Sequence, residues 1–185
     1  MIYVIDHEDS FTYNLVHLLE KFAPTYVSNY YDLDRKRLEK SKIIVFSPGP
    51  GDPSHYPETQ QIFHQYKGVK KIIGICLGFQ QILFAHKAKI IPQKKIYHGY
   101  QSKVKVLKDS SFFKPNKIFL AGRYHSLKLK EPFKSASLKI TMRCVETNVA
   151  MAIEDTINNV YGFQFHPDSF LTVDGKLLIQ KIIQA

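Results

Sequence analysis

Cys76 stands where an apolar run ends and a helix-like run begins, with Gly74 and Gly78 two residues away on either side. This pattern, G-x-C-x-G, is a thiol version of the strand-to-helix nucleophile elbow, whose sharp turn exposes the reactive side chain. At a helix N-terminus, unpaired amides and the helix dipole favour a thiolate and can also bind an oxyanion. The pattern predicts a nucleophilic thiol, and its alternative is a buried structural cysteine.

A histidine and a carboxylate follow a second apolar run. His166-Pro167-Asp168 comes directly after residues 160–165. Because residues i and i+2 of a strand point to one side, His166 and Asp168 can face the same cleft. The imidazole would take and return protons, and the carboxylate would hold its tautomer. A surface turn explains this tripeptide alone, but its combination with Cys76 and the Pro- and Gly-rich segment 47–53 favours thiol catalysis.

The elements that must position these residues alternate between strand and helix in the first half of the chain. We expect strands at 1–6, 26–29, 43–46 and 71–75, and helices at 10–22, 33–39, 57–66 and from 77. Ser10 is expected to cap the first helix. This alternation predicts an α/β fold with a mostly parallel central sheet flanked by helices, and with the site at the carboxyl ends of the strands.

The second half of the chain has short alternating runs instead, which predict additional antiparallel strands. The expected strands are 94–98, 102–107, 117–120, 138–145, 149–153 and 160–165, before a closing helix at 175–183. No linker, repeat or low-complexity segment divides the chain. We therefore expect residues 1–185 to form a single domain.

Composition narrows the classes of function. The net charge is +10, but the lysines are dispersed, which favours a solvated surface over protein docking, and both over nucleic acid. The chain enters a strand pattern at once and has no run long enough to span a membrane, so we expect a cytoplasmic protein. The two cysteines, Cys76 and Cys144, lie far apart, and the histidines show no metal-ligand spacing. Most histidines are interpreted as surface or helix-face residues.

Three motifs occur in a family's expected order: Ser47-Pro-Gly-Pro-Gly51, Gly74 to Gln80, and Gly162-Phe-Gln-Phe-His-Pro-Asp-Ser169. On these motifs the chain resembles, over its full length, a class I glutamine amidotransferase of the triad type. Two further stretches, Asp6 to Leu15 and Arg123-Tyr-His-Ser-Leu127, are similar to the small subunits of anthranilate synthase and aminodeoxychorismate synthase. Such subunits supply ammonia to a chorismate-binding synthase subunit.

The resemblance implies a complete glutaminase site. Cys76 would form a glutamyl thioester, His166 would act as acid and base, and Asp168 would orient it, so that glutamine yields glutamate and ammonia. Amides of Gly51 and Leu77 would stabilise the oxyanion. The substrate-binding residues that it implies are Gly49, Gly51, Leu77, Gln80, Ser126 and Leu127. It implies neither a cofactor nor a metal.

Three positions depart from the family's usual pattern. Asp168 replaces a glutamate, Phe79 replaces a histidine, and His98-Gly-Tyr-Gln-Ser102 replaces H-G-K-[TA]-S, a segment that lies near the partner in relatives. The last departure predicts altered partner contacts. Two alternatives remain at this stage: another thiol hydrolase on the same fold, such as a gamma-glutamyl peptide hydrolase, and a catalytically silent regulatory or binding subunit.

Overall fold

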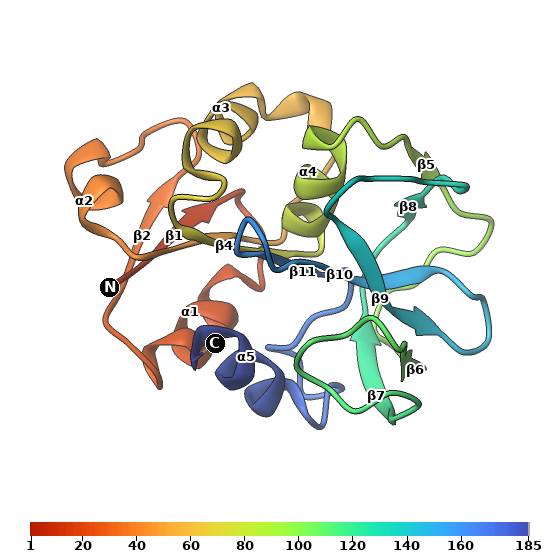
Figure 1. The fold of residues 1–185 in the computed structure, drawn as a ribbon. Helices are drawn as coiled ribbons and strands as arrows, with labels where there is room; N and C mark the ends of the chain where they lie inside the picture. Colours follow the sequence, from red (N-terminus) through yellow and green to blue (C-terminus); the bar gives the residue numbers. More distant parts are fainter. Residues whose placement is uncertain (185) are drawn as a thin grey trace.

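The computed structural model describes residues 1–184 and places a large β-sheet between two layers of helices (Figure 1). The sheet has nine strands in the order β2-β1-β3-β4-β11-β10-β9-β6-β7. Its strands are β1 (Ile2–Asp6), β2 (Thr25–Asn29), β3 (Ile43–Phe46), β4 (Lys71–Ile75), β6 (Tyr100–Val106), β7 (Ile118–Arg123), β9 (Lys139–Cys144), β10 (Ala150–Asp155) and β11 (Val160–Phe163). A separate antiparallel pair is formed by β5 (Ile90–Pro92) and β8 (Leu127–Leu129).

Strand direction divides the large sheet as the sequence predicts. β2, β1, β3, β4 and β11 are mutually parallel, whereas β10, β9, β6 and β7 continue the sheet with antiparallel pairs. Parallel strands are joined by crossover connections that put helices on both faces, so their side chains are buried on both sides. Every residue of β1 and β4 is accordingly buried. The predicted α/β fold is confirmed.

The helices cover the two faces of the sheet (Figure 1). They are α1 (Thr12–Glu20), α2 (Arg35–Lys40), α3 (Pro57–Tyr66), α4 (Leu77–Ala85) and α5 (Gly175–Gln184), with a 3-10 turn at Pro53–His55. Leucines and isoleucines of α1 and α5 pack in one hydrophobic core, and apolar residues of α2, α3 and α4 pack in the other. Both cores meet the parallel half of the sheet, so the strand ends that carry the site are held from both sides.

Some local expectations were wrong. Residues 94–98 form no strand; instead Tyr97 N–H and Gly99 N–H donate to the carbonyls of His125 and Arg123, so the segment follows the 123–126 turn without a regular ladder. Ser10 does not cap α1, which begins at Thr12 with Phe11 at its cap position. β8, at Leu127–Leu129, was missed because three residues carry too little periodicity to recognise.

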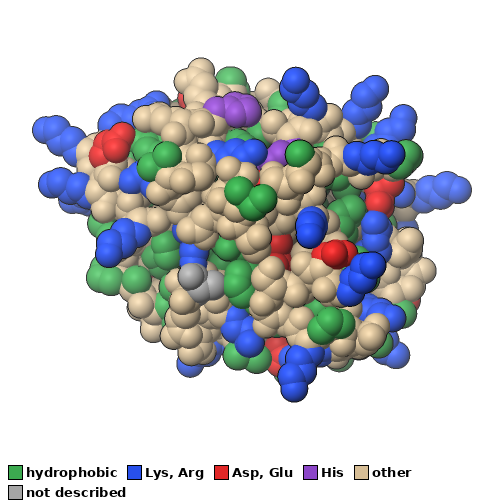
Figure 2. All heavy atoms as spheres, in the orientation of Figure 1, with side chains coloured by type: hydrophobic (Ala, Val, Ile, Leu, Met, Phe, Trp, Pro, Cys, Tyr) green, Lys and Arg blue, Asp and Glu red, His purple; other side chains and the backbone are tan. Residues whose placement is uncertain are grey.

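The surface charge is dispersed. Figure 2 shows lysine and arginine side chains over all parts of the visible face, with few acidic groups between them and no single basic stripe. Within residues 1–184, no helix has the length and apolarity required to cross a membrane.

Candidate active site

Cys76 occupies a strained turn between β4 and α4. Its φ of 52° and ψ of −99° put a non-glycine residue in the positive-φ region, which L-residues rarely adopt. The backbone N–H of Cys76 donates to the Phe163 carbonyl at 2.8 Å, which ties the turn to β11. Strain of this kind persists only where the surrounding structure enforces it, and it is common at active sites. The predicted elbow is therefore present, with the thiol at the N-terminus of α4.

Glycines allow three segments to meet at this elbow. A Cβ on Gly78 would lie 2.2 Å from the Phe46 carbonyl oxygen at the end of β3, and one on Gly74 would lie 2.3 Å from the Gly78 oxygen. A Cβ on Gly49 would lie 2.5 Å from both His7 Cβ and Leu77 Cδ2. The Pro- and Gly-rich loop after β3 is thus packed directly against the start of α4.

Amide groups at this contact are available to an oxyanion. The N–H groups of Gly51 and Leu77 make none of the hydrogen bonds recorded within residues 1–184. Gly51 has a φ of 76°, a conformation that glycine adopts at no steric cost. Leu77 begins α4, where the first N–H groups of a helix have no intrahelical partner. These two amides have the chemistry that the sequence predicts for stabilising negative charge on a reacting oxygen.

His166 follows β11, the strand next to β4, and therefore lies at the same edge of the sheet as the thiol. Its backbone is fixed because its N–H donates to the Gly122 carbonyl at 3.0 Å and its carbonyl accepts from Thr172 Oγ1 at 2.6 Å. Its ring lies edge-on to the rings of Phe11 and Tyr124, with centroids 5.0 and 4.9 Å away. The imidazole is therefore buried and held in one orientation.

The Asp168 carboxylate lies beside that imidazole, with Oδ1 3.8 Å from His166 Nδ1. This distance permits electrostatic attraction but exceeds a hydrogen bond, and neither ring nitrogen of His166 has a hydrogen-bond partner in the described residues. Burial lowers the pKa of His166, but attraction to Asp168 and to the Cys76 thiol outweighs burial and raises it to about 10. The geometry thus favours an imidazolium beside the sulfur.

Two buried glutamines connect the thiol to α4. Gln164 Nε2 donates to Cys76 Sγ at 3.8 Å, and Gln80 Nε2 donates to Gln164 Oε1 at 3.1 Å. Both glutamines are almost fully buried. Gln164 was not assigned a role by the sequence, although it lies in the quoted motif two residues before His166.

A cavity of about 220 Å³ opens beside Cys76. All six residues implied as substrate-binding line it together with the nucleophile: Gly49, Gly51, Leu77, Gln80, Ser126 and Leu127. The sequence reasoning missed the other lining residues, Asp9, Pro50, Tyr124 and His125. Asp9 and His125 lie in the two stretches, 6–15 and 123–127, that resemble the synthase small subunits. This resemblance was the signal in the sequence that could have identified them.

His125 is locked as a neutral ring by Arg123. Arg123 Nε donates to His125 Nε2 at 3.0 Å, and His125 Nδ1 donates to the Leu127 carbonyl at 2.7 Å. Burial and the Arg123 charge lower the pKa of His125 to about 3. Because the ring bridges the ends of the segment 125–127, it fixes the turn that presents Ser126 to the cavity. Most histidines were expected at the surface or on helix faces, and His7 and His125 are buried exceptions.

This arrangement can perform acyl transfer from an amide. Cys76 Sγ, at a helix N-terminus, can attack the carbonyl carbon, and the N–H groups of Gly51 and Leu77 can donate hydrogen bonds to the developing oxyanion. The adjacent imidazolium donates a proton to the departing amine and afterwards takes one from water. Within residues 1–184, no group of three or more His, Cys, Asp or Glu side chains has the arrangement of a metal site.

Known proteins resemble this chain in sequence and in fold. The family described as "Glutamine amidotransferase class-I" matches residues 3–185. Anthranilate synthase component 2 of Lactococcus lactis is 37% identical over 99% of this chain and 93% of its own length, and that of Cyanidium caldarium is 33% identical over 99% and 97%.

Solved structures support the fold. A glutamine amidotransferase from Thermotoga maritima has a TM-score of 0.68 at 18% identity, covering 90% of this chain and 75% of its own. A protein from Thermoplasma acidophilum has a TM-score of 0.85 at 20% identity, over 99% of this chain and 92% of its own.

The two buried histidines predict a loss of stability in acid. Burial lowers the pKa of His7 to about 3, and its ring contacts Ser47 and Thr59. In the unfolded chain histidine titrates near ~6.5, so between about 6.5 and 3 the unfolded state binds more protons. The free energy of unfolding should therefore fall as the pH falls through this window.

Urea unfolding between neutral and mildly acidic pH measures this slope. His7→Gln should make this pH dependence shallower, because it removes one of the two histidines whose pKa is lowered. His17→Gln, on the exposed face of α1, should leave the pH dependence unchanged. Identical slopes for the wild type and His7→Gln would show that His7 is not held neutral by the fold.

Proposed function

The chain belongs to the class I glutamine amidotransferases, and from this premise we propose that it is the glutaminase subunit of a chorismate-aminating synthase. Its reaction would supply ammonia for the synthesis of anthranilate or aminodeoxychorismate. The observation that carries the proposal is the convergence of Cys76, His166 and Asp168 beside a cavity lined by every implied glutamine-binding residue. The relatives named anthranilate synthase component 2 support the choice of partner.

The proposed mechanism uses the site as it is built. Cys76 Sγ attacks the side-chain amide carbon of glutamine, and the amides of Gly51 and Leu77 stabilise the oxyanion. His166 gives its proton to the nitrogen that leaves as ammonia, and the glutamyl group remains on sulfur as a thioester. Water, deprotonated by His166, then releases glutamate and restores the thiol. Asp168 stabilises the imidazolium through the 3.8 Å separation.

We assign recognition of the substrate's α-ammonium group to Asp9. Among the residues that line the cavity, Asp9 has the only carboxylate, and His125 is held neutral. Asp9 Oδ1 already accepts from the Phe11 N–H at 2.8 Å, which fixes the carboxylate and leaves Oδ2 for a ligand. A fixed carboxylate in a small polar cavity is suited to an amino acid's ammonium group.

The partner would bind near the segment 98–102. The His98 ring lies edge-on to the Tyr124 ring at 5.8 Å, and Tyr124 both lines the cavity and packs against His166. Contact at this segment would therefore reach the catalytic imidazole through one aromatic ring. The proposal treats residues 1–185 as one domain, and it places the protein in the cytoplasm, where a reactive thiol remains reduced.

The first prediction concerns the origin of ammonia. Cys76→Ser nearly preserves side-chain volume, but a hydroxyl is much harder to ionise than a thiol. In a complex with the chorismate-binding subunit of anthranilate or aminodeoxychorismate synthase, this variant should lose glutamine-dependent product formation. It should retain close to the unmodified rate with ammonium salts at alkaline pH, since free ammonia reaches the partner directly.

Product formation with glutamine and with ammonium, measured side by side for both products, tests this. Retained glutamine-dependent synthesis would remove Cys76 as nucleophile. Failure to form either product with either partner, while the chain alone hydrolyses gamma-glutamyl peptides faster than glutamine, would favour the hydrolase alternative instead.

The second prediction concerns Asp9. Asp9→Asn keeps the Oδ1 acceptor but removes the charge, so the KM for glutamine should rise about tenfold, the effect of losing one charge-assisted hydrogen bond. The kcat should change less. Glu8→Gln removes a neighbouring exposed charge and should leave both constants near wild type.

A substrate analogue separates recognition from structural damage. 4-Carbamoylbutanoate is glutamine without its α-amino group, so its kcat/KM should be nearly the same for the wild type and Asp9→Asn. An equal loss of kcat/KM for glutamine and for the analogue would contradict the assignment of Asp9 to the ammonium group.

A further inference from the structure

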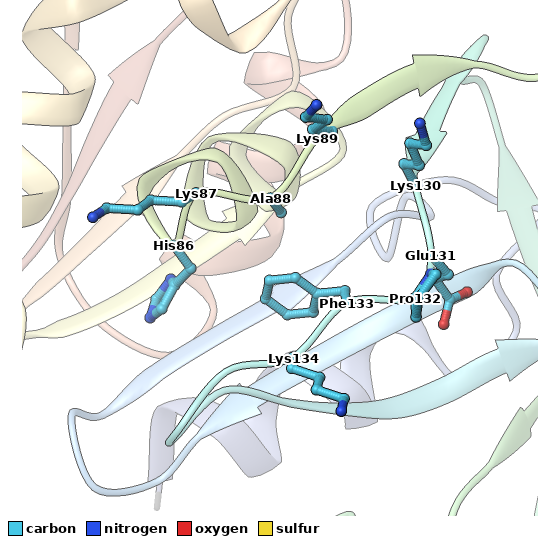
Figure 3. Close-up of a pocket in the computed structure, with 9 residues that line it drawn as sticks. All are labelled: His86, Lys87, Ala88, Lys89, Lys130, Glu131, Pro132, Phe133 and Lys134. Atoms are coloured by element: carbon cyan, nitrogen blue, oxygen red, sulfur yellow. The ribbon is translucent and has the colours of Figure 1, made fainter.

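A second hollow lies away from the thiol, beyond the C-terminal end of α4. Its volume is about 530 Å³, and it is formed by residues 86–89, after α4, and residues 130–134, after β8 (Figure 3). Four of its nine lining residues are lysines: Lys87, Lys89, Lys130 and Lys134. The glutaminase chemistry uses none of these residues.

Two of the lysines face each other across a strand pair. Ile90 of β5 is paired with Leu129 of β8 in an antiparallel register, so Lys89 and Lys130 are the next opposite pair. The Lys130 N–H donates to the Lys89 carbonyl at 2.8 Å, which holds the two backbones together. Figure 3 shows both ammonium groups at the same rim of the hollow. Like charges at opposite positions of a strand pair repel each other, and both of these lysines are exposed.

The hollow contains no free carboxylate to offset this repulsion. Its single acid, Glu131, is bound by Arg143, whose Nη1 and Nη2 donate to the two carboxylate oxygens at 2.8 and 2.6 Å. This interaction lowers the pKa of Glu131, so the ion pair persists at neutral pH. Within residues 1–184, none of the four lysines lies within ion-pair distance of an acidic group.

The remaining walls shape the hollow. The Phe133 ring lies in its centre, between His86 and Pro132, while the Lys134 ammonium is at the opposite rim and Lys87 points outward (Figure 3). Burial lowers the pKa of His86, and its Nδ1 contacts the Ile82 carbonyl at 2.9 Å, which fixes the ring. Lysines above an apolar floor interact with an anion at a lower effective dielectric than in open water.

We propose that this hollow binds a compact phosphate-class anion with at least two negative charges, held by Lys89 and Lys130 at their shared rim. Lysine recognises phosphate as a point charge with several donors, and an anion at this rim removes the repulsion between Lys89 and Lys130. The site is separate from the glutaminase cavity: no residue lines both.

The test is a calorimetric titration with inorganic pyrophosphate at constant ionic strength. The wild type should show saturable binding with one site per chain. Lys89→Gln combined with Lys130→Gln should weaken binding about tenfold or more, because two charge-assisted contacts are lost. The matched control is Lys36→Gln combined with Lys40→Gln, which removes two exposed lysines one turn apart on α2 and should change the affinity by less than about twofold.

Absence of saturable binding, or equal weakening by both double variants, would overturn the proposal. The second would mean that pyrophosphate responds only to the net charge. A short single-stranded DNA tests whether the lysines bind the phosphates of a nucleic acid instead. This DNA should bind no more tightly than pyrophosphate. The proposal would also be overturned if the oligonucleotide bound more tightly than pyrophosphate and the Lys89→Gln, Lys130→Gln variant bound the oligonucleotide as well as the wild type does.

Thermal unfolding provides a measurement that does not depend on heats of binding. Pyrophosphate should raise the Tm of the wild type and of the α2 control, since a ligand that binds only the folded state stabilises it. It should not raise the Tm of the Lys89→Gln, Lys130→Gln variant. An equal rise in all three proteins, or no rise in any, would contradict a site at this hollow.

Discussion

The turn at Cys76 is the constraint on which the structure of the site depends. A residue with a φ of 52° must be held between a buried strand and a buried helix, and only close approach of neighbouring backbones enforces it. Gly74 and Gly78 permit that approach, since a Cβ on either would lie 2.3 Å or less from a backbone oxygen. The same contacts bring the loop after β3 to the helix start. The nucleophile and the oxyanion amides are therefore positioned together.

The sheet order positions the proposed base, His166. β11 is parallel to β4 with Phe163 opposite Ile75, so the chain that continues past Phe163 leaves the sheet at the same edge as Cys76. His166 thereby reaches the thiol although 90 positions separate them in the sequence. The shorter side chain of Asp168 remains compatible with this geometry, because attraction over 3.8 Å still contributes to the raised pKa of His166. The strand pairing, more than any local segment, creates the proposed catalytic arrangement.

Sequence patterns predicted the parts of this arrangement that depend on local chemistry. The glycine spacing around Cys76, the buried strand 43–46 and the helix 57–66 each follow from a period or a turn residue, and the structure has them. The role of Asp9 could not be predicted in this way, because it depends on which side chains share the cavity. The neutral state of His125 could not be predicted either, because it depends on the buried Arg123 side chain that contacts its ring. The error at 94–98 has the same origin, because tertiary hydrogen bonds replaced a strand.

The central claim is that Cys76 is the glutamine-reactive nucleophile, and active-site labelling tests it most directly. The chain has two cysteines, Cys76 and Cys144, both free and buried, but only Cys76 lines the cavity. Mass spectrometry after treatment with a glutamine-analogue chloroketone should find one adduct, on Cys76, whose formation glutamine slows in competition. Labelling of Cys144 instead, or labelling of Cys76 that glutamine does not slow, would contradict the account.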